Sequence, residues 1–136
     1  MAKTNRDEFT QKSKSQIAKR AGWLCSDPSC RRPTIGSNSD GDGEINVGTA
    51  AHICAAAPDG PRYNPNQTPA QRRSPDNGIW MCRIHGTAID ARDSQFTIKL
   101  LHEWKAQAQK DSWRRVLYND VSHGTAVQAP TEAELN

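Results

Sequence analysis

The chain has 136 residues, which is enough for one domain and too few for two independent hydrophobic cores. Hydrophobic residues make up 35% of it and aromatic residues 6%, with 9 Gly and 8 Pro, so the core is small and needs support from a metal, a disulfide or a partner. The net charge is +3, no apolar run approaches the roughly 18 residues of a membrane-spanning helix, and the polar first residues do not resemble a signal peptide. We therefore expect neither a membrane protein nor a secreted one.

The first third of the chain predicts a helix followed by a compact turn. Residues 11–21 are mostly helix-forming, and Gly22 is a suitable stop at their C-terminal end. Residues 23–30 (WLCSDPSC) predict a knuckle, with an Asp-Pro turn at its centre. Residues 33–44 are rich in turn-forming residues and lack side chains that pack, so we expect a loop there.

Two short strands and two helices are expected in the middle of the chain. Residues 45–57 alternate β-branched and apolar residues, as a strand or hairpin arm does, and residues 77–82 predict a second strand after an Asn-Gly turn. The five prolines of residues 58–76 predict an irregular loop. A helix begins near residues 85–90, and residues 97–119 predict a longer helix whose inward-facing side chains are Ile98, Leu101, Trp104, Ala108, Val116 and Leu117.

The end of the chain differs in composition from the rest. Residues 122–136 lack any apolar pattern, so we expect a flexible tail or a linker to a further domain after a domain at 1–121. The predicted order of helix, knuckle, hairpin and two helices is that of an α+β fold.

The charges are unevenly spread along the chain. Residues 1–35 carry eight Lys and Arg against three acidic residues. Residues 61–85 carry four arginines against Asp76 alone, namely Arg62, Arg72, Arg73 and Arg83. Two basic segments of this kind suit a polyanion such as nucleic acid, and an ordinary solvated surface is the alternative.

Four residues have the types and spacing of metal ligands. Cys25 and Cys30 form one close pair and Cys82 and His85 another, with 51 residues between the pairs. Three thiolates and one imidazole are a closed tetrahedral set for a structural Zn²⁺, and zinc binding would stabilise a fold with a small core. The alternative is a set of unrelated residues with buried thiols. Cys54 has no partner nearby in the sequence, so we expect it to be a buried thiol.

The motifs together resemble the HNH nucleases. The resemblance runs from about residue 14 to 105 and rests on KRAGWLCSDPSC, AAHICAAAPDGPRYNP, RRSPDNGIWMCRIHGTAID and LLHEW. In order and wording these segments are similar to the HNH domains of bacterial nucleases, including effectors of antiphage defence. The resemblance implies an α+β fold with a ββα-metal core, a structural zinc knuckle and flanking N- and C-terminal helices.

The same resemblance implies a reaction and roles for individual residues. It implies hydrolysis of DNA phosphodiester bonds with a divalent cation, Mg²⁺ or Mn²⁺, and with His52 as the general base. The middle Asn of the motif maps to Asn77, which would orient the base or hold the loop between the strands. The structural zinc maps to Cys25, Cys30, Cys82 and His85, and phosphate contacts to Arg62, Arg72, Arg73 and Arg83.

Two positions differ from the HNH pattern. Ala51 and Gly86 stand where many HNH proteins have ligands of the catalytic cation. Asp90 could supply a carboxylate instead, with Asp59 and Asp76 as further candidates. Each proposed site residue also has a structural alternative: packing for His52, an Asn-Gly turn for Asn77, and capping or pairing on a helix for Asp90.

Three functions stay open at this point. The first is a DNA endonuclease that serves as an antiphage effector, with a fused sensor domain or a second copy as partner. The second is a catalytically inactive, zinc-stabilised nucleic-acid-binding module, and the third is a protein–protein adaptor. The resemblance and the free thiols indicate a bacterial or phage cytoplasm. The expected substrate is double-stranded DNA, with the choice between DNA and RNA left open.

Overall fold

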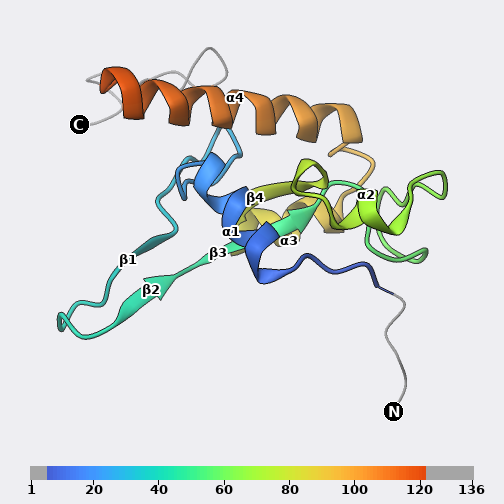
Figure 1. Ribbon diagram of the computed structural model, residues 1–136, viewed down its shortest axis with the longest axis horizontal. Coiled ribbons are helices and arrows are strands. Elements are labelled where there is room, and N and C mark those ends of the chain that lie inside the picture. The colour runs from blue at the N-terminus through green and yellow to red at the C-terminus, as the bar shows by residue number, and fades with distance from the viewer. Residues whose placement is uncertain (1–5, 122–136) are drawn as a thin grey trace.

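The computed structural model describes residues 6–121, and the expected tail at 122–136 lies outside this range. The fold is mixed α+β, as expected, with two separate two-stranded antiparallel sheets. The elements in chain order are α1 (Gln11–Arg20), β1 (Ile35–Ser37), β2 (Glu44–Asn46), β3 (Gly48–His52), α2 (Pro69–Arg73), the 3-10 helix η1 (Pro75–Asn77), β4 (Gly78–Cys82), α3 (Arg83–Ala91) and α4 (Ile98–Tyr118). Figure 1 shows α4 lying along one side of the molecule. The β1–β2 hairpin projects from the body of the molecule.

The pair of strands β3 and β4 lies at the centre of the molecule. They run antiparallel, from Gly48 opposite Cys82 to His52 opposite Gly78. Every residue of β4 is buried, and its side chains alternate between two hydrophobic clusters. Ile79 and Met81 pack with side chains of α3 and α4 on one face, whereas Trp80 packs with α1 on the other. The second predicted strand is therefore confirmed, whereas the first, expected at 45–57, is divided between β2 and β3 and ends at His52. Helices pack on both faces of the β3–β4 pair.

Helix α1 begins and ends where the sequence predicts. The Thr10 side chain caps its N-terminus by accepting a hydrogen bond of 3.1 Å from the backbone N–H of Ser13. Gly22, just beyond the helix, has φ of +63°, a conformation that favours glycine. A side chain there would also press on Ser112 and Arg115 of α4, so Gly22 lets α4 approach closely.

Residues 33–44 differ from the expectation of a loop without strands. They contain β1 and the first residue of β2, which form a short hairpin in which Ile35 pairs with Asn46. The turn residues close the hairpin locally, since Asn38 hydrogen-bonds to the backbone of Asp42 and Gly43. The expectation that the segment does not pack holds for the two strands, in which every residue is exposed, but not for Thr34, which is buried and accepts a hydrogen bond from Trp80.

The proline-rich segment 58–76 is more ordered than expected. It contains the short helix α2 and most of η1. Thr68 and Gln71 form a reciprocal capping box at the start of α2, and Pro69 occupies the first helical position. The sequence does contain this signal, a Thr followed three residues later by Gln. The five prolines of the segment nevertheless favoured the prediction of an irregular loop.

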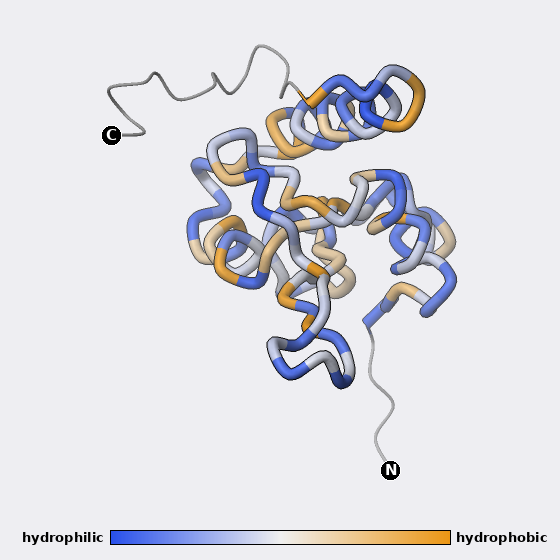
Figure 2. The backbone as a smooth tube through the Cα atoms, turned by 90° about the vertical axis from the view of Figure 1, so that its left-hand side faces the viewer, coloured by the Kyte–Doolittle hydropathy of each residue, from blue (hydrophilic) through white to orange (hydrophobic). Residues whose placement is uncertain are grey.

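Helix α4 is confirmed, but three of its predicted inward positions are wrong. Leu101 and Ala108 are buried and Trp104 is half-buried, whereas Ile98, Val116 and Leu117 are 39%, 80% and 57% exposed. Ile98 is the first residue of α4, and the C-terminal end of the helix extends past α1 (Figure 1), so these residues lie beyond the part of α4 that covers the core. Figure 2 shows the same helix at the top of the molecule. Among the described residues, no helix combines the length and the apolarity needed to cross a lipid bilayer.

Candidate functional site

The four predicted metal ligands come together beside the end of β4. Their ligand atoms all lie within 4.8 Å of one another. Nδ1 of His85 is 3.2 Å from Sγ of Cys82 and 3.9 Å from Sγ of Cys25. A tetrahedral zinc ion with ordinary bond lengths holds its sulfur and nitrogen ligands about 3.5 Å apart. Cys25, Cys30, Cys82 and His85 therefore form a cluster that could hold a metal ion, consistent with a structural zinc.

Local structure orients these ligands. In the knuckle, the Asp27 carboxylate accepts hydrogen bonds from the backbone N–H and the hydroxyl of Ser29, at 2.9 and 2.7 Å, which fixes the turn. At the other pair, Cys82 is the N-cap of α3, and its sulfur accepts the backbone N–H of His85 at 3.4 Å. The positive end of a helix favours the thiolate form that a metal requires.

The burial of the cluster indicates a structural role. Cys25 is fully buried, and this burial raises the pKa of its thiol to about 12. Such a thiol stays protonated at neutral pH unless a cation replaces the proton. Four protein ligands fill a tetrahedron and leave no position for a substrate. Cys54 is buried outside this cluster, as predicted.

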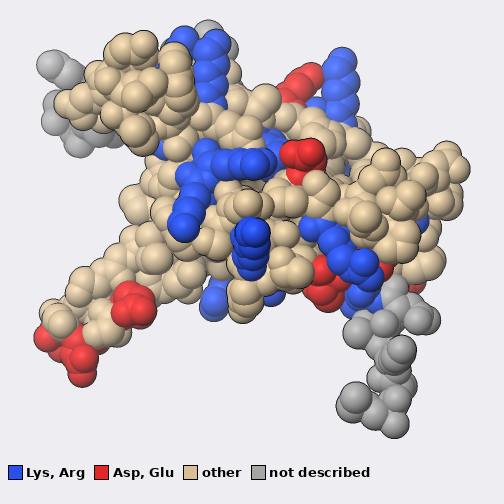
Figure 3. Space-filling model, in the orientation of Figure 1, with Lys and Arg blue, Asp and Glu red and all other residues tan. Residues whose placement is uncertain are grey.

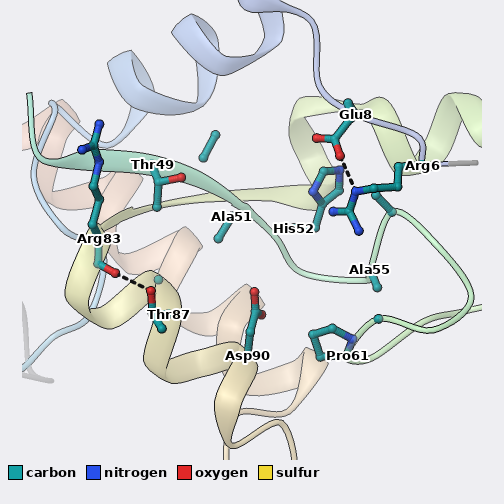
Figure 4. Close-up of a pocket in the computed structure, with 14 residues that line it drawn as sticks. Arg6, Glu8, Thr49, Ala51, His52, Ala55, Pro61, Arg83, Thr87 and Asp90 are labelled. Atoms are coloured by element: carbon teal, nitrogen blue, oxygen red, sulfur yellow. Dashed lines mark hydrogen bonds and ion pairs between the residues drawn. The ribbon is translucent and has the colours of Figure 1, made fainter. Parts of the chain in front are cut away.

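A cavity of about 520 Å³ lies beside β3, and His52 forms part of its wall. Its lining comes from the segment before α1, from β3, from the loop after β3 and from α3. Figure 4 shows Arg6 and Glu8 next to His52, with Asp90 of α3 across the cavity from them. Three segments distant in sequence thus place a histidine, two carboxylates and a guanidinium group around one space.

His52 is held in an orientation suited to a base. Its Nε2 is 3.1 Å from the backbone carbonyl of Asp7, and its ring stacks on Phe9 with 3.9 Å between centroids. Because a carbonyl only accepts hydrogen bonds, Nε2 carries the proton and Nδ1 keeps the lone pair. Burial lowers the pKa of His52 below its ordinary value, although the carbonyl of Asp7 and the carboxylate of Glu8 oppose that shift. The imidazole is therefore neutral at pH 7.

Asn77 lies outside this cavity. Its side-chain oxygen accepts the backbone N–H of Cys54, and its amide nitrogen donates to the carbonyls of Cys54 and Arg72, all at 2.9 to 3.0 Å. Its own backbone carbonyl accepts the N–H of Ile53. The contacts with Ile53 and Cys54 hold the chain just after His52, and the contact with Arg72 joins it to the end of α2. Of the two roles considered for Asn77, this geometry matches holding the loop.

Two of the four arginines expected to bind phosphate, Arg62 and Arg72, have buried side chains. The Arg62 side chain is 4% exposed and donates to the carbonyls of Ile53 and Ile89 and to Asp90 at 2.6 to 2.8 Å. The Arg72 side chain is 8% exposed, contacts Asp7 and lies over the ring of Tyr63. Both expectations are wrong, because these guanidinium groups are occupied inside the protein.

The other two arginines remain at the surface. Arg73 is half-exposed and forms an ion pair with Asp7 at 3.0 Å. Arg83 is exposed and lines the cavity that contains His52. Figure 3 shows lysines and arginines gathered over the middle of one face, above α1, and acidic side chains at the tip of the β1–β2 hairpin as well as at several places on the body of the domain.

Sequence reasoning missed two residues of this cavity, Arg6 and Glu8. They line the cavity beside His52 and form an ion pair with each other. The excess of basic residues in the first 35 positions pointed to this segment, but nothing local indicated that it folds back onto β3. Asp90 does line the cavity, with its side chain 48% exposed and paired with Arg62 at 2.8 Å.

The cavity lacks a complete cation site of its own. Within residues 6–121, the zinc-type cluster is the only group of three or more His, Cys, Asp or Glu ligands close enough to share an ion. No family model matches the chain, and no curated protein matches it. The functional argument therefore rests on the residues and their geometry.

Proposed function

We propose that this chain is an HNH-type endonuclease domain that hydrolyses phosphodiester bonds of DNA with a divalent cation. One observation carries the proposal: His52 has its Nε2 on a backbone carbonyl and its Nδ1 lone pair available, and it lines a cavity that also contains Asp90 and Arg83. A neutral, oriented imidazole beside cationic groups is suited to activating water next to a phosphate.

Three residues of the cavity, His52, Arg83 and Asp90, have distinct roles in this proposal. Nδ1 of His52 removes the proton of the attacking water, and the contact of Nε2 with Asp7 holds the ring during the transfer. Arg83, at the end of the cavity away from His52, binds a flanking phosphate of the same strand. Asp90 is the protein ligand for Mg²⁺ or Mn²⁺, which would stabilise the negative charge on the phosphate and the leaving oxygen.

The zinc cluster and Asn77 act at a distance from the reaction. The cluster ties the knuckle to the junction of β4 and α3, the helix that carries Asp90. Asn77 fixes the chain directly after His52. We further propose, on the resemblance to HNH nucleases alone, that the domain is the effector part of an antiphage defence protein in a bacterial or phage cytoplasm.

A second candidate function is supported by a different observation. Asp90 is paired with Arg62, and Ala51 and Gly86 provide no ligand atoms, so the cavity has few groups to hold a cation. A zinc-stabilised module that binds nucleic acid without cleaving it agrees with this scarcity. Binding without cleavage is the outcome that separates it from the nuclease.

The deciding experiment is cleavage of supercoiled plasmid with Mg²⁺ or Mn²⁺. We expect nicking by the wild type, a loss of about 100-fold or more in His52→Ala, and unchanged activity in His102→Ala, whose histidine is exposed on α4. Equal cleavage by the wild type and His52→Ala would show that His52 is not the base. Plasmid binding without cleavage in both would support the inactive binding module.

A further inference from the structure

A second cavity of about 520 Å³ lies between α1 and β3, next to the one that contains His52. The two cavities share Glu8, Thr49, Ala50 and Arg83 in their linings. Figure 4 shows Thr49 and Arg83 at the end of the first cavity that is away from His52. Phe9 lines the second cavity and stacks on His52, which lines the first. The two cavities are therefore neighbours along their shared residues, so that one chain-like molecule could occupy both.

Aromatic rings form one side of the second cavity. Its lining includes Phe9, Trp23 and Trp80. Trp80 is fixed, because its indole N–H donates to the Thr34 hydroxyl at 2.9 Å and its ring meets that of Trp23 edge-on. A side chain at Gly48 would come within 2.2 Å of the Trp80 ring, so only glycine leaves room for the ring in this position.

Trp23 sits in an unusual backbone conformation. Its φ is +62°, which is rare and strained for a large side chain. Two hydrogen bonds maintain it: Trp23 donates to the Ala18 carbonyl at 2.9 Å, and the Thr34 N–H donates to the Trp23 carbonyl at 3.0 Å. The ring is half-buried, so part of it stays accessible. Strain that holds an accessible aromatic ring against a cavity points to a binding role.

The rest of the lining is mostly polar, with Lys14 and Arg83 as cations and with Glu8, which pairs with Arg6, as an acidic residue. Gln11, Lys14 and Ser15 follow the spacing of one face of α1 and all line the cavity. The side-chain amide oxygen of Asn46 accepts the backbone N–H of Gly48 at 2.9 Å, which leaves its amide NH₂ as a donor. Flat rings, amide and hydroxyl groups, and two cations together match a planar heterocycle that is attached to a phosphate.

We propose that the second cavity binds an unpaired nucleobase of the strand whose phosphate occupies the cavity beside His52. The inference rests on the proposed function, since it names part of the substrate of the same site. Trp23 stacks on the base, the polar groups of α1 and Asn46 contact its edge, and Lys14 and Arg83 bind the flanking phosphates. A base inside a duplex cannot enter such a cavity, so the substrate is single-stranded at this position or has its base flipped out.

The test compares two single-stranded oligonucleotides with the same backbone, in EDTA so that no cleavage occurs. One carries 2-aminopurine throughout, and the other is abasic throughout. We expect quenching of the 2-aminopurine fluorescence on binding, and binding of the abasic strand to be roughly 5- to 100-fold weaker. Equal affinity for the two strands, without quenching, would overturn the base site.

Variants assign the effect to this cavity. Trp23→Ala should remove most of the preference for the strand with bases, whereas Trp113→Ala, which removes an exposed indole on α4, should retain it. If circular dichroism shows that Trp23→Ala does not fold, Ser15→Phe is the second variant, because a ring at this position of α1 fills the cavity while every residue of the knuckle stays unchanged. A preference for bases that survives Ser15→Phe contradicts the assignment.

The base site and the proposed nuclease can fail separately. Plasmid cleavage that depends on His52, together with equal binding of both oligonucleotides, refutes the base site and leaves the nuclease intact. A clear preference for bases without any cleavage supports the base site and refutes the nuclease.

Discussion

The side chains around His52 determine both its charge and its direction. Phe9 covers one face of the ring, the Asp7 carbonyl holds Nε2, and burial disfavours the charged imidazolium. The nearby charges partly cancel, since Glu8 and Asp90 favour the cation whereas Arg6 opposes it. A base needs a free lone pair at working pH, and this environment supplies one.

The pKa of His52 can be measured directly. We expect NMR titration of its ring to give a value below the ordinary value of about 6.5. Since the unfolded chain takes up the proton first, the stability that this group contributes is complete above about pH 6.5 and declines as the pH falls toward the folded pKa. A measured value at or above 6.5 would show that burial does not control this histidine.

Buried arginines at several positions hold backbone or carboxylate groups rather than ligands. Arg62 donates to carbonyls of the loop after β3 and of α3 and thereby ties together two walls of the cavity. Arg31, which follows the zinc-type ligand Cys30, contacts Asp111 of α4 at 3.2 Å with both side chains almost completely buried. Removing one partner from such a pair leaves a buried charge uncompensated.

Among the elements, the knuckle and the β4–α3 junction carry the four ligands that could hold a metal ion. The knuckle also contacts β4 through a backbone hydrogen bond of 2.9 Å from the N–H of Ser26 to the carbonyl of Trp80. Cys25 and Cys82 also belong to the principal hydrophobic cluster, so the metal site is continuous with the core. Metal binding and folding are therefore expected to be coupled.

Substitution of one ligand tests this coupling. We expect about one zinc per chain in the wild type, and loss of both the zinc and the cooperative thermal transition in Cys82→Ser. Cys54→Ala is the matched control, because Cys54 is a buried cysteine outside the cluster and should keep its zinc. Metal analysis and circular dichroism provide the measurements, and a folded, zinc-free Cys82→Ser would contradict the ligand assignment.

At the scale of the whole molecule, basic side chains gather on one face. They lie over α1, whereas acidic side chains occupy the tip of the projecting hairpin and several places on the body of the domain (Figure 3). A concentration of positive charge is suited to binding a polyanion. The proposed path of such a polyanion depends on the arginines left at the surface rather than on their number in the sequence.

The salt dependence of DNA binding tests this surface. We expect the affinity for an oligonucleotide duplex to fall as salt rises, and the slope of log K against log salt to decrease by about 1–2 in Lys14→Ala/Arg83→Ala. Lys99→Ala/Lys110→Ala removes two exposed cations from α4 and should leave the slope almost unchanged. Equal slopes in the two double variants would show that DNA binds to a different surface.

Local sequence patterns by themselves determined α1, the strands β3 and β4, α4 and the four metal ligands. Each of these depends on neighbouring residues: helix caps, alternating apolar positions, or two cysteines and a cysteine–histidine pair at short spacing. These patterns can be interpreted without knowledge of the rest of the fold, because the interactions that produce them are local.

Only the tertiary structure decided which charged and polar residues face the cavities. The sequence does not distinguish Arg62 and Arg72, which are buried, from Arg73 and Arg83, which are at the surface. It also did not show that the segment with Glu8 folds against β3 or that the end of α4 runs past the core. The physical reason is that the burial of a charge depends on partners far away in the chain, and these partners come together only in the folded domain.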